Sequence, residues 1–489
     1  MQLVSIQFAL FAAILLLLYY RAPRGRQWQL LLAASMIFYM GAGLRYLVFL
    51  LFTAASSFTA ALLLEKNRGK KQACRRWLAA CLVTNFGILF VCKVYLLFPH
   101  SDCFLSVGLP MGMSFYIFQS MGYCTDVSRG REAEKSFFRF LLFTSYFPQL
   151  IQGPISKYSD LQPQLMDNHS YDKKQVSFGL QRMLWGYFKK LVIADRIGPA
   201  VAVLRGSEYT GFPFFLLTLF YAVQIYSDFT GGMDIALGLS QALGIKLTEN
   251  FLHPFFSRSI AQYWRRWHIT LGSWMREYIF YPVSISKPIR QLGKSVRKRY
   301  PKFGKRFPVY AATLVTWLAT GLWHGLTPNF LLWGFLNCAV IVLSEELTPV
   351  YRKFHSHFRW KDKSWYGAFE MLRTFLMMNL IRSCDLFPNP GDYFRKLGSL
   401  VRIWDISFLL DGGILTLGLS RLDYGILIIG SGLLLAVSFT QERYGSIREY
   451  LWGKPMLRRS LLFGLFLTIL LMGHYGVGYS ASSFIYNQF

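Results

Sequence analysis

Apolar runs long enough to cross a membrane recur from one end of this sequence to the other. A helix needs about 20 mainly apolar residues to cross the hydrocarbon core of a bilayer. The chain has 489 residues, of which 53% are hydrophobic and only 16% charged, whereas soluble domains are about 25% charged. The candidate runs are 3–20, 28–44, 46–64, 77–98, 108–125, 137–152, 177–194, 212–227, 229–245, 308–326, 329–345, 368–384, 424–440 and 460–477.

Gly, Pro and charged residues interrupt several of these runs. Such interruptions are tolerated at membrane depth only where protein or water satisfies the backbone. We therefore predict an all-α integral membrane protein with roughly eleven to thirteen transmembrane helices, together with re-entrant and interfacial helices. The first run lacks a preceding basic segment and a following cleavage site, so we interpret it as a retained helix. No internal repeat is visible, and we expect residues 1–489 to form a single multi-pass domain.

Positive charge is concentrated between the apolar runs. The chain has 53 Lys and Arg against 25 Asp and Glu, a formal net charge of +28. This distribution is typical of cytoplasmic loops and of contact with anionic lipid, so we expect a membrane-lipid partner and no nucleic acid. The clusters predicted to be cytoplasmic are 21–26, 66–76, 129–139, 287–306 and 352–363. Segment 385–423 has five Asp against four basic residues, and we place it outside.

The cysteine pattern gives no sign of a disulfide framework or a zinc site. The seven cysteines are odd in number, lie mostly in apolar segments and lack metal-type spacing. His355 and His357 form a weak metal-binding pair, because surrounding cations oppose a metal ion and no carboxylate or thiol joins them closely. We expect no metal and no tightly bound cofactor.

His324 is the most unusual histidine in the sequence. It follows Trp323 at the end of an apolar run, in the segment 316–325 (TWLATGLWHG). Ionisable residues at membrane depth are costly and usually mark a pathway or an active site. Desolvation there favours a neutral imidazole that can accept a proton. The alternative is a structural histidine that bonds a neighbouring carbonyl.

A second histidine, His268, follows an aromatic and basic segment. Trp264, Arg265 and Arg266 precede it, and Arg276 follows eight residues later. Trp, Tyr and Arg together suit an interfacial helix, with the rings at headgroup level and the guanidinium groups in water. The segment is thus either an interfacial anchor or part of a site.

Two further segments carry polar residues within apolar surroundings. The segment 224–234 contains Tyr226, Asp228 and Asp234, and we expect the two carboxylates to pair with Arg265, Arg266 or Arg276 rather than to act as acid and base. The segment 147–154 contains Gln149 and Gln152 before a Gly-Pro step. It is consistent with a cavity lining or with a packed kink.

These segments, in this order, resemble the membrane-bound O-acyltransferase (MBOAT) family, and specifically its branch with the membrane protein of alginate O-acetylation. The resemblance spans nearly the whole chain. The matching pieces are 109–116 (LPMGMSFY), 126–130 (DVSRG), 147–154 (FPQLIQGP), 224–229 (QIYSDF), 249–251 (ENF), 264–268 (WRRWH), 320–325 (TGLWHG) and 484–489 (FIYNQF).

The resemblance implies a ring of tilted helices around a thin central region in a bacterial cytoplasmic membrane. It implies that His324 and His268 are catalytic, with His324 at the bottom of an outward funnel and His268 nearer the cytoplasm. It also implies a cytoplasmic thioester donor, either acetyl-CoA or a phosphopantetheine carrier protein, and transfer toward an extracytoplasmic acyltransferase partner or a polysaccharide acceptor. The segment 484–489 is more similar to the alginate branch than to the related D-alanyl transfer branch.

Acyl transfer to a hydroxyl requires positioning of the hydroxyl and removal of its proton, for which His324 is the candidate base. Backbone N–H groups near Gly325 and the side chain of Asn329 are equally possible oxyanion donors. Two other functions remain: D-alanyl transfer from a carrier protein to teichoic acid, and a polysaccharide or lipid transporter or flippase. Transporters commonly contain repeated halves, which this sequence does not show.

Overall fold

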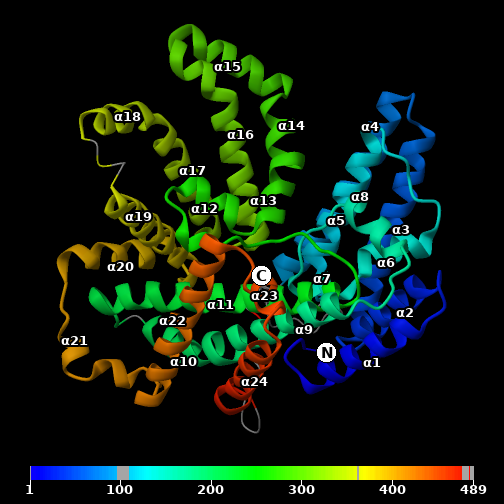
Figure 1. The fold of residues 1–489 in the computed structure, drawn as a ribbon. Coiled ribbons are helices and arrows are strands. Elements are labelled where there is room, and N and C mark those ends of the chain that lie inside the picture. The colour runs from blue at the N-terminus through cyan, green and yellow to red at the C-terminus, as the bar shows by residue number, and fades with distance from the viewer. Residues whose placement is uncertain are drawn as a thin grey trace. The chain divides into compact units, whose positions relative to one another are not determined.

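The protein is almost entirely helical (Figure 1). The structure, a computed structural model, describes residues 2–95, 109–206, 208–358, 360, 363–475 and 484. Within these residues, extended pairing is limited to an isolated bridge between Phe251 and Trp267. Cys103 and residues 485–489 lie outside the described residues. The predicted all-helical fold class is confirmed.

Six of the described helices are long and apolar enough to cross a membrane. They are α3 (Leu44–Lys66), α4 (Lys71–Tyr95), α11 (Phe212–Ala242), α17 (Pro328–Glu346), α22 (Arg421–Tyr444) and α24 (Pro455–Met472). A shorter apolar helix is α1 (Ile6–Arg21). The number of eleven to thirteen crossings therefore stays a prediction.

Two compact units divide the chain, and each is described by itself. Unit 1 comprises Met1–Lys190, Asp228–Glu249 and Leu451–Gln488, and unit 2 comprises Leu191–Ser227, Asn250–Tyr450 and Phe489. Helix α11 contributes residues to both units. The prediction of a single domain over residues 1–489 is neither confirmed nor contradicted by this division.

Unit 1 contains a close contact between α9 (Lys173–Tyr187) and the second half of α11. A Cβ atom added to Gly179 would lie 2.4 Å from the carbonyl oxygen of Gly238. Only glycine permits such an approach of two helix backbones. The other helices of this unit are α1 to α4, α5 (Met113–Ser128), α6 (Phe137–Ser145), α7 (Phe147–Gln152), α8 (Tyr158–Met166) and α24.

Unit 2 contains a hairpin in which α15 (Lys287–Arg299) packs along α16 (Pro301–His324), as Figure 1 shows. Helix α16 ends at His324 and α17 begins at Pro328, in agreement with the break between the apolar runs 308–326 and 329–345. The remaining helices with most or all of their residues in this unit are α10 (Asp195–Leu204), α12 (Ile260–Arg266), α13 (Ile269–Met275), α14 (Tyr281–Ser284), α18 (Thr348–His357), α19 (Ser364–Arg382), α20 (Pro390–Arg402), α21 (Ser407–Leu410), α22 and α23 (Ile447–Trp452). Short 3-10 and π segments are η1 (Phe188–Ala194), η2 (Pro254–Phe256), η3 (Arg276–Phe280), η5 (Ser383–Leu386) and η6 (Gly413–Thr416).

Four apolar runs fold differently from the sequence pattern. The runs 212–227 and 229–245 form the single 31-residue helix α11, because packing against neighbours maintains the helix through the glycine pair at 231–232. The run 137–152 breaks at Tyr146, whose extended ψ angle separates α6 from α7. The run 177–194 ends as the π-helix η1, and this places Lys189 and Lys190 in the interior. Helical periodicity alone predicts neither the break at Tyr146 nor the π-helix η1.

Candidate functional site

His268 of unit 2 is held by two short backbone segments that pair with each other. Leu252 donates its N–H to the carbonyl of Arg266 at 3.0 Å, and Ile269 donates to the carbonyl of Asn250 at 3.0 Å. His268 lies between these bonds, as the N-cap of α13, with a left-handed φ of 48°. A non-glycine residue adopts this conformation only where the surrounding structure enforces it, and such residues cluster at functional sites.

The Asn250 side chain fixes the orientation of the His268 ring. Its amide oxygen lies 3.3 Å from His268 Nδ1 and also accepts bonds from the N–H and hydroxyl groups of Thr270, at 2.9 and 3.0 Å. An amide oxygen can only accept, so Nδ1 carries the proton and Nε2 carries the lone pair. Burial, assisted by the charge of Arg382, lowers the pKa of His268 to about 3. The ring is therefore neutral, as expected for a buried imidazole.

His324 is the last residue of α16 and lies among aromatic rings. Its ring is 4.9 Å from that of Trp333 and stacks at 6.2 Å on Phe330. Gly321 allows this packing, because a Cβ atom there would lie 2.3 Å from the carbonyl oxygen of Phe330. The backbones of α16 and α17 thus approach closely just before the histidine.

Trp323 connects the two histidines. Its ring lies 5.9 Å from His268 and 4.8 Å from His324, measured between centroids. All three side chains are buried. Unit 2 therefore brings together the two histidines that the sequence placed 56 residues apart (324 − 268 = 56).

Other predicted site residues of unit 2 surround this cluster. Trp264 packs against Trp317 and Trp333, at 4.7 and 5.8 Å, and so shares Trp333 with His324. Tyr226 is buried, and its ring lies 6.3 Å from that of Trp267, the residue before His268. Both contacts add aromatic rings beside the histidine cluster.

Arg382 is a site residue that the sequence reasoning missed. It is 5% exposed at the end of α19, and its guanidinium lies 4.5 Å above the ring of Trp267. Three residues later, burial raises the pKa of the Asp385 carboxyl to about 6. The sequence did contain a signal for Arg382, because it is an arginine within the apolar run 368–384. It also contained a signal for Asn250, which lies in the matching piece 249–251.

Asn329 is not an oxyanion donor in this structure, which corrects that hypothesis. Its side-chain nitrogen donates to the carbonyl oxygens of Cys384, at 3.0 Å, and Phe387. Both protons of the amide are thus committed to joining α17 to η5. The N–H of Gly325 is likewise engaged, because it donates to the carbonyl of Gly321 at 3.0 Å.

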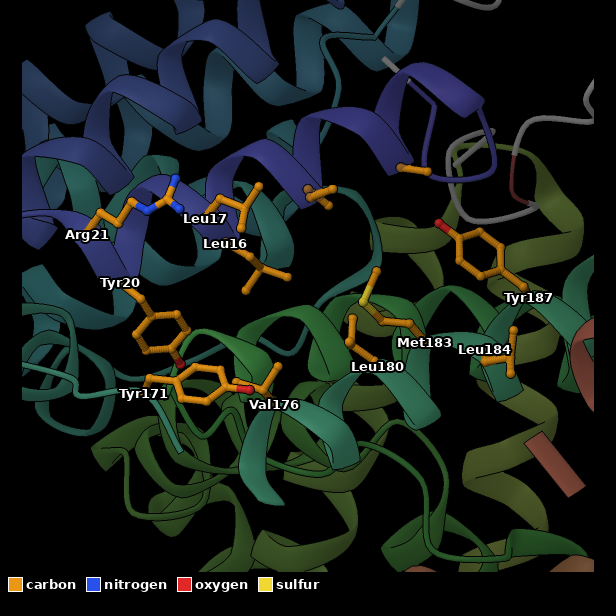
Figure 2. Close-up of a pocket in the computed structure, with 13 residues that line it drawn as sticks. Leu16, Leu17, Tyr20, Arg21, Tyr171, Val176, Leu180, Met183, Leu184 and Tyr187 are labelled. Carbon is orange, nitrogen blue, oxygen red and sulfur yellow. The ribbon is translucent and has the colours of Figure 1, made fainter. Parts of the chain in front are cut away.

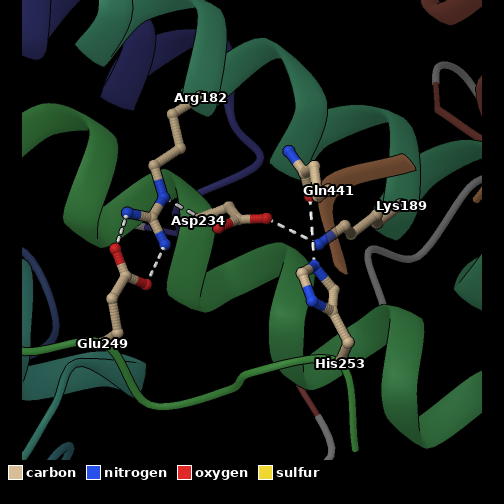
Figure 3. A network of polar contacts seen from close by, with 6 residues as sticks. All are labelled: Arg182, Lys189, Asp234, Glu249, His253 and Gln441. Atoms are coloured by element: carbon tan, nitrogen blue, oxygen red, sulfur yellow. Dashed lines mark hydrogen bonds and ion pairs between the residues drawn. The ribbon is translucent and has the colours of Figure 1, made fainter. Parts of the chain in front are cut away.

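Unit 1 contains a network of charges around the buried residues Asp234 and Lys189 (Figure 3). Asp234 accepts from Arg182 at 2.8 Å and from Lys189 at 2.6 Å. The other two guanidinium nitrogens of Arg182 bind both carboxylate oxygens of Glu249, at 2.5 and 2.6 Å. This paired and bidentate geometry compensates the cost of burying the charges.

A second buried ion pair of unit 1 joins Lys190 to Asp228 at 2.6 Å. The Lys190 ammonium also lies 4.5 Å from the ring centroid of Phe484. Gln152 is fully buried nearby, since a Cβ atom on Gly232 would lie 1.6 Å from its amide oxygen. Gln149 is also buried and donates to the carbonyl of Phe143 at 3.0 Å.

The expected partners of the carboxylates were wrong. Asp234 pairs with Arg182 and Lys189, and Asp228 pairs with Lys190, rather than with the arginines of segment 265–276. Arg266 instead binds Glu442 at 2.8 Å, while Arg265 is exposed. The error has a physical cause. Lysines inside the run 177–194 were counted as interruptions of a crossing, although a buried lysine requires a carboxylate partner.

Two histidines outside the cluster, His253 and His355, have ordinary polar partners. His253 lies 3.2 Å from the Gln441 amide oxygen, also drawn in Figure 3, and His355 lies 2.8 Å from the Tyr366 hydroxyl. Among the described residues, no three His, Cys, Asp or Glu side chains are grouped as metal ligands. The six cysteines within the described ranges are free thiols.

The fold and the site together define a class of protein: a helical membrane protein with two buried histidines. Residues 124–296 match the family model described as MBOAT, membrane-bound O-acyltransferase family. The match includes His268 and Asn250, whereas His324 lies beyond it. The chain therefore contains a domain of the membrane-bound O-acyltransferase family.

Curated relatives extend this similarity. The probable alginate O-acetylase AlgI of Azotobacter vinelandii is 32% identical over 340 residues, which are 66% of this chain and 64% of the relative. The peptidoglycan O-acetyltransferase of Helicobacter pylori is 29% identical, over 75% of this chain and 77% of the relative. The teichoic acid D-alanyltransferase of Bacillus subtilis is 24% identical, over 54% and 65%. The chain thus spans just under two thirds of the alginate relative's length.

Proposed function

We propose that this protein is an O-acyltransferase of a bacterial cytoplasmic membrane. It moves an acyl group, most simply acetyl, from a cytoplasmic thioester donor toward an extracytoplasmic polysaccharide or a partner acyltransferase. The family domain and the relatives named for O-acetylation support this proposal. The observation that carries it is the buried contact of His268, Trp323 and His324.

The two histidines have different chemical suitability. A general base works best when its pKa lies near the working pH. With a pKa of about 3, His268 is a weak base, and its fixed ring is suited to hydrogen bonding and positioning. We therefore assign proton removal to His324 and orientation of the donor to His268.

In the proposed step, the acceptor hydroxyl oxygen attacks the thioester carbonyl carbon, and His324 takes the hydroxyl proton. The carbon–sulfur bond then breaks, and the sulfur leaves as a thiol with the proton returned by the imidazolium. Positioning of the two reactants and removal of water supply much of the rate. Arg382 contributes positive charge beside His268 while the negative tetrahedral intermediate exists.

Acyl transfer by the purified protein tests this function. Labelled acetyl-CoA and a labelled D-alanyl carrier thioester are offered separately, with a soluble polysaccharide acceptor and with water alone. We expect label on the acceptor from the acetyl donor. Exclusive use of the D-alanyl carrier would instead support the function named for the 24% identical relative. Movement of intact glycan without acyl transfer would contradict both acyltransferase functions and support a transporter.

Helix α15 is the proposed docking surface for the donor. Lys294, Arg297, Lys298 and Arg299 are exposed on it. Such a surface attracts an acidic carrier protein, and salt weakens the attraction because it screens exposed charges. We expect charge reversal at 297–299 to raise the donor KM at low salt.

The matched control reverses Lys71, Arg75 and Arg76, which are exposed on α4. It should leave the donor KM unchanged. Equal effects of the two triple variants would eliminate α15 as a specific docking surface. Cysteine labelling at Ser295 tests sidedness, because the cytoplasmic assignment predicts reaction only from the inner side.

A further inference from the structure

An apolar groove lies between α1 and α9 within unit 1 (Figure 2). Its volume is about 630 Å³, within the range of small-molecule sites. Leu16 and Leu17 line it from α1, and Leu180 and Met183 line it from α9. Leu17 and Leu180 are 59% and 46% exposed, so the groove is open at the surface. Its middle section offers carbon and sulfur atoms to an occupant.

The surroundings of the groove favour a lipid acyl chain as its occupant. Leu10, Ile14 and Leu18 project from α1 and are each about half or more exposed, as expected for a helix that faces lipid. The lining runs from Ala9 to Arg21, which is about 18 Å along a helix. One leaflet of a bilayer contributes about 15 Å of hydrocarbon. The groove therefore matches the length of one leaflet's acyl chains.

One end of the groove is polar and basic. Arg21, the last residue of α1, is exposed there beside Tyr20 and Tyr171, whose rings meet edge to face at 5.5 Å. The Tyr20 hydroxyl is fixed by its bond to the Ala242 carbonyl at 2.7 Å. Tyr and Arg at the end of an apolar stretch are typical of the headgroup level.

Neighbouring charges favour an anion at this end. Arg24 and Arg26 follow Arg21, and Lys173 begins α9. Asp172 is an opposing charge in the same segment, and its carboxylate accepts the N–H groups of Lys174 and Gln175 at 2.7 and 3.0 Å as the N-cap of α9. Basic side chains near a membrane surface attract anionic lipid.

We propose that this groove is a binding site for one anionic glycerophospholipid. An acyl chain lies between α1 and α9, and the phosphate lies against Arg21 at the tyrosine end. The inference is independent of the acyl-transfer function, since the groove contains neither His268 nor His324. The lipid would hold α1 against α9 and so stabilise unit 1.

Native mass spectrometry of the purified full chain, titrated with phosphatidylglycerol or phosphatidylcholine, tests the site. We expect one phosphatidylglycerol to bind with at least fivefold preference over phosphatidylcholine. Ala13→Phe fills the groove and should reduce occupancy of both lipids at least fivefold. Ile14→Phe adds the same ring to the adjacent, exposed position outside the lining, and should bind like the wild type.

Arg21→Gln tests the contribution of the lipid headgroup separately from that of the acyl chain, because this exposed substitution leaves the groove intact. It should abolish the preference for phosphatidylglycerol while phosphatidylcholine occupancy persists. Arg76→Gln, an exposed arginine on α4, is the control and should keep the preference. Equal binding by Ala13→Phe and Ile14→Phe would overturn the proposed groove. A preference unchanged in Arg21→Gln would overturn the proposed phosphate position.

Discussion

Unit 1 and unit 2 bury ionisable side chains in contrasting ways. In unit 1, Asp234 is neutralised by Arg182 and Lys189 at hydrogen-bonding distance. In unit 2, His268 and His324 lie among aromatic rings, and the first is held neutral by burial. Charges that are paired and saturated with hydrogen bonds hold helices together. A neutral imidazole in an apolar setting retains a lone pair for proton transfer.

The largest expected effect is on catalysis in unit 2. His324→Ala should lower the rate of acyl transfer by about 10²–10⁴-fold, the usual contribution of a general base. Donor binding should change little and the variant should remain folded, because the aromatic neighbours Phe330 and Trp333 stay in place. Rate, donor affinity and Tm are measured on the same preparation. His357→Ala, at an exposed position of α18, is the matched control. Near-normal turnover in His324→Ala would return this histidine to a structural role.

The next effect is on the stability of unit 1. Asp234→Asn leaves Lys189 buried without its carboxylate, a change that costs about 3–5 kcal/mol. We expect a clearly lower Tm or loss of folded protein. Glu346→Gln removes the exposed partner of Arg306 and should leave the Tm nearly unchanged. A stable but inactive Asp234→Asn variant would break the contrast between the units, because it would assign catalysis to the charged network.

Two ionisable groups of unit 2 should oppose each other in the pH dependence of stability. The pKa of His268 is lowered from 6.5 to about 3, so the unfolded chain binds more protons between these values. Its contribution is complete above pH 6.5 and is lost as the pH falls, by about 1.4 kcal/mol per pH unit. The raised pKa of Asp385, about 6 instead of 3.8, acts in the opposite direction. Stability from this group is present below pH 3.8 and is lost as the pH rises toward 6.

His268→Gln should therefore flatten the loss of Tm on acidification from about pH 7 to pH 5, whereas Asp385→Asn should steepen it. Thermal unfolding of the three proteins across this range gives the comparison. Parallel curves for wild type and His268→Gln would show that His268 is not buried as a neutral ring.

The smallest expected effect concerns orientation of His268. Asn250→Ala removes the acceptor of the Nδ1 proton, a hydrogen bond that contributes about 0.5–1.5 kcal/mol. Transfer should slow by roughly two- to tenfold. Thr270→Val also removes a bond to the Asn250 oxygen but leaves His268 its partner, so it should preserve the pH profile of the rate. An unchanged profile in Asn250→Ala would remove Asn250 from the positioning role.

Several predictions depended on information that is local in the sequence. The turn after His324 follows from the break between the apolar runs 308–326 and 329–345, which contains Pro328, and it is present in the structure. The helical fold class follows from apolar runs, since only internally hydrogen-bonded helices or closed barrels cross a bilayer. Pairing of charges did not follow. Lys189 and Asp234 are 45 residues apart, and only the packing of α9 and η1 against α11 joins them.

The sequence by itself determined the membrane class and the helical fold, and it singled out His268 and His324 as candidate site residues. Hydropathy and unusual residues in apolar runs are properties of short segments. Tertiary structure alone decided that Trp323, the residue before His324, packs against His268 and that Asn250 selects the tautomer of His268. It also decided that Asn329 joins α17 to η5 and has no donor left for an oxyanion. These outcomes depend on contacts between segments distant in the chain, and a side chain's partners are set by packing rather than by its neighbours in sequence.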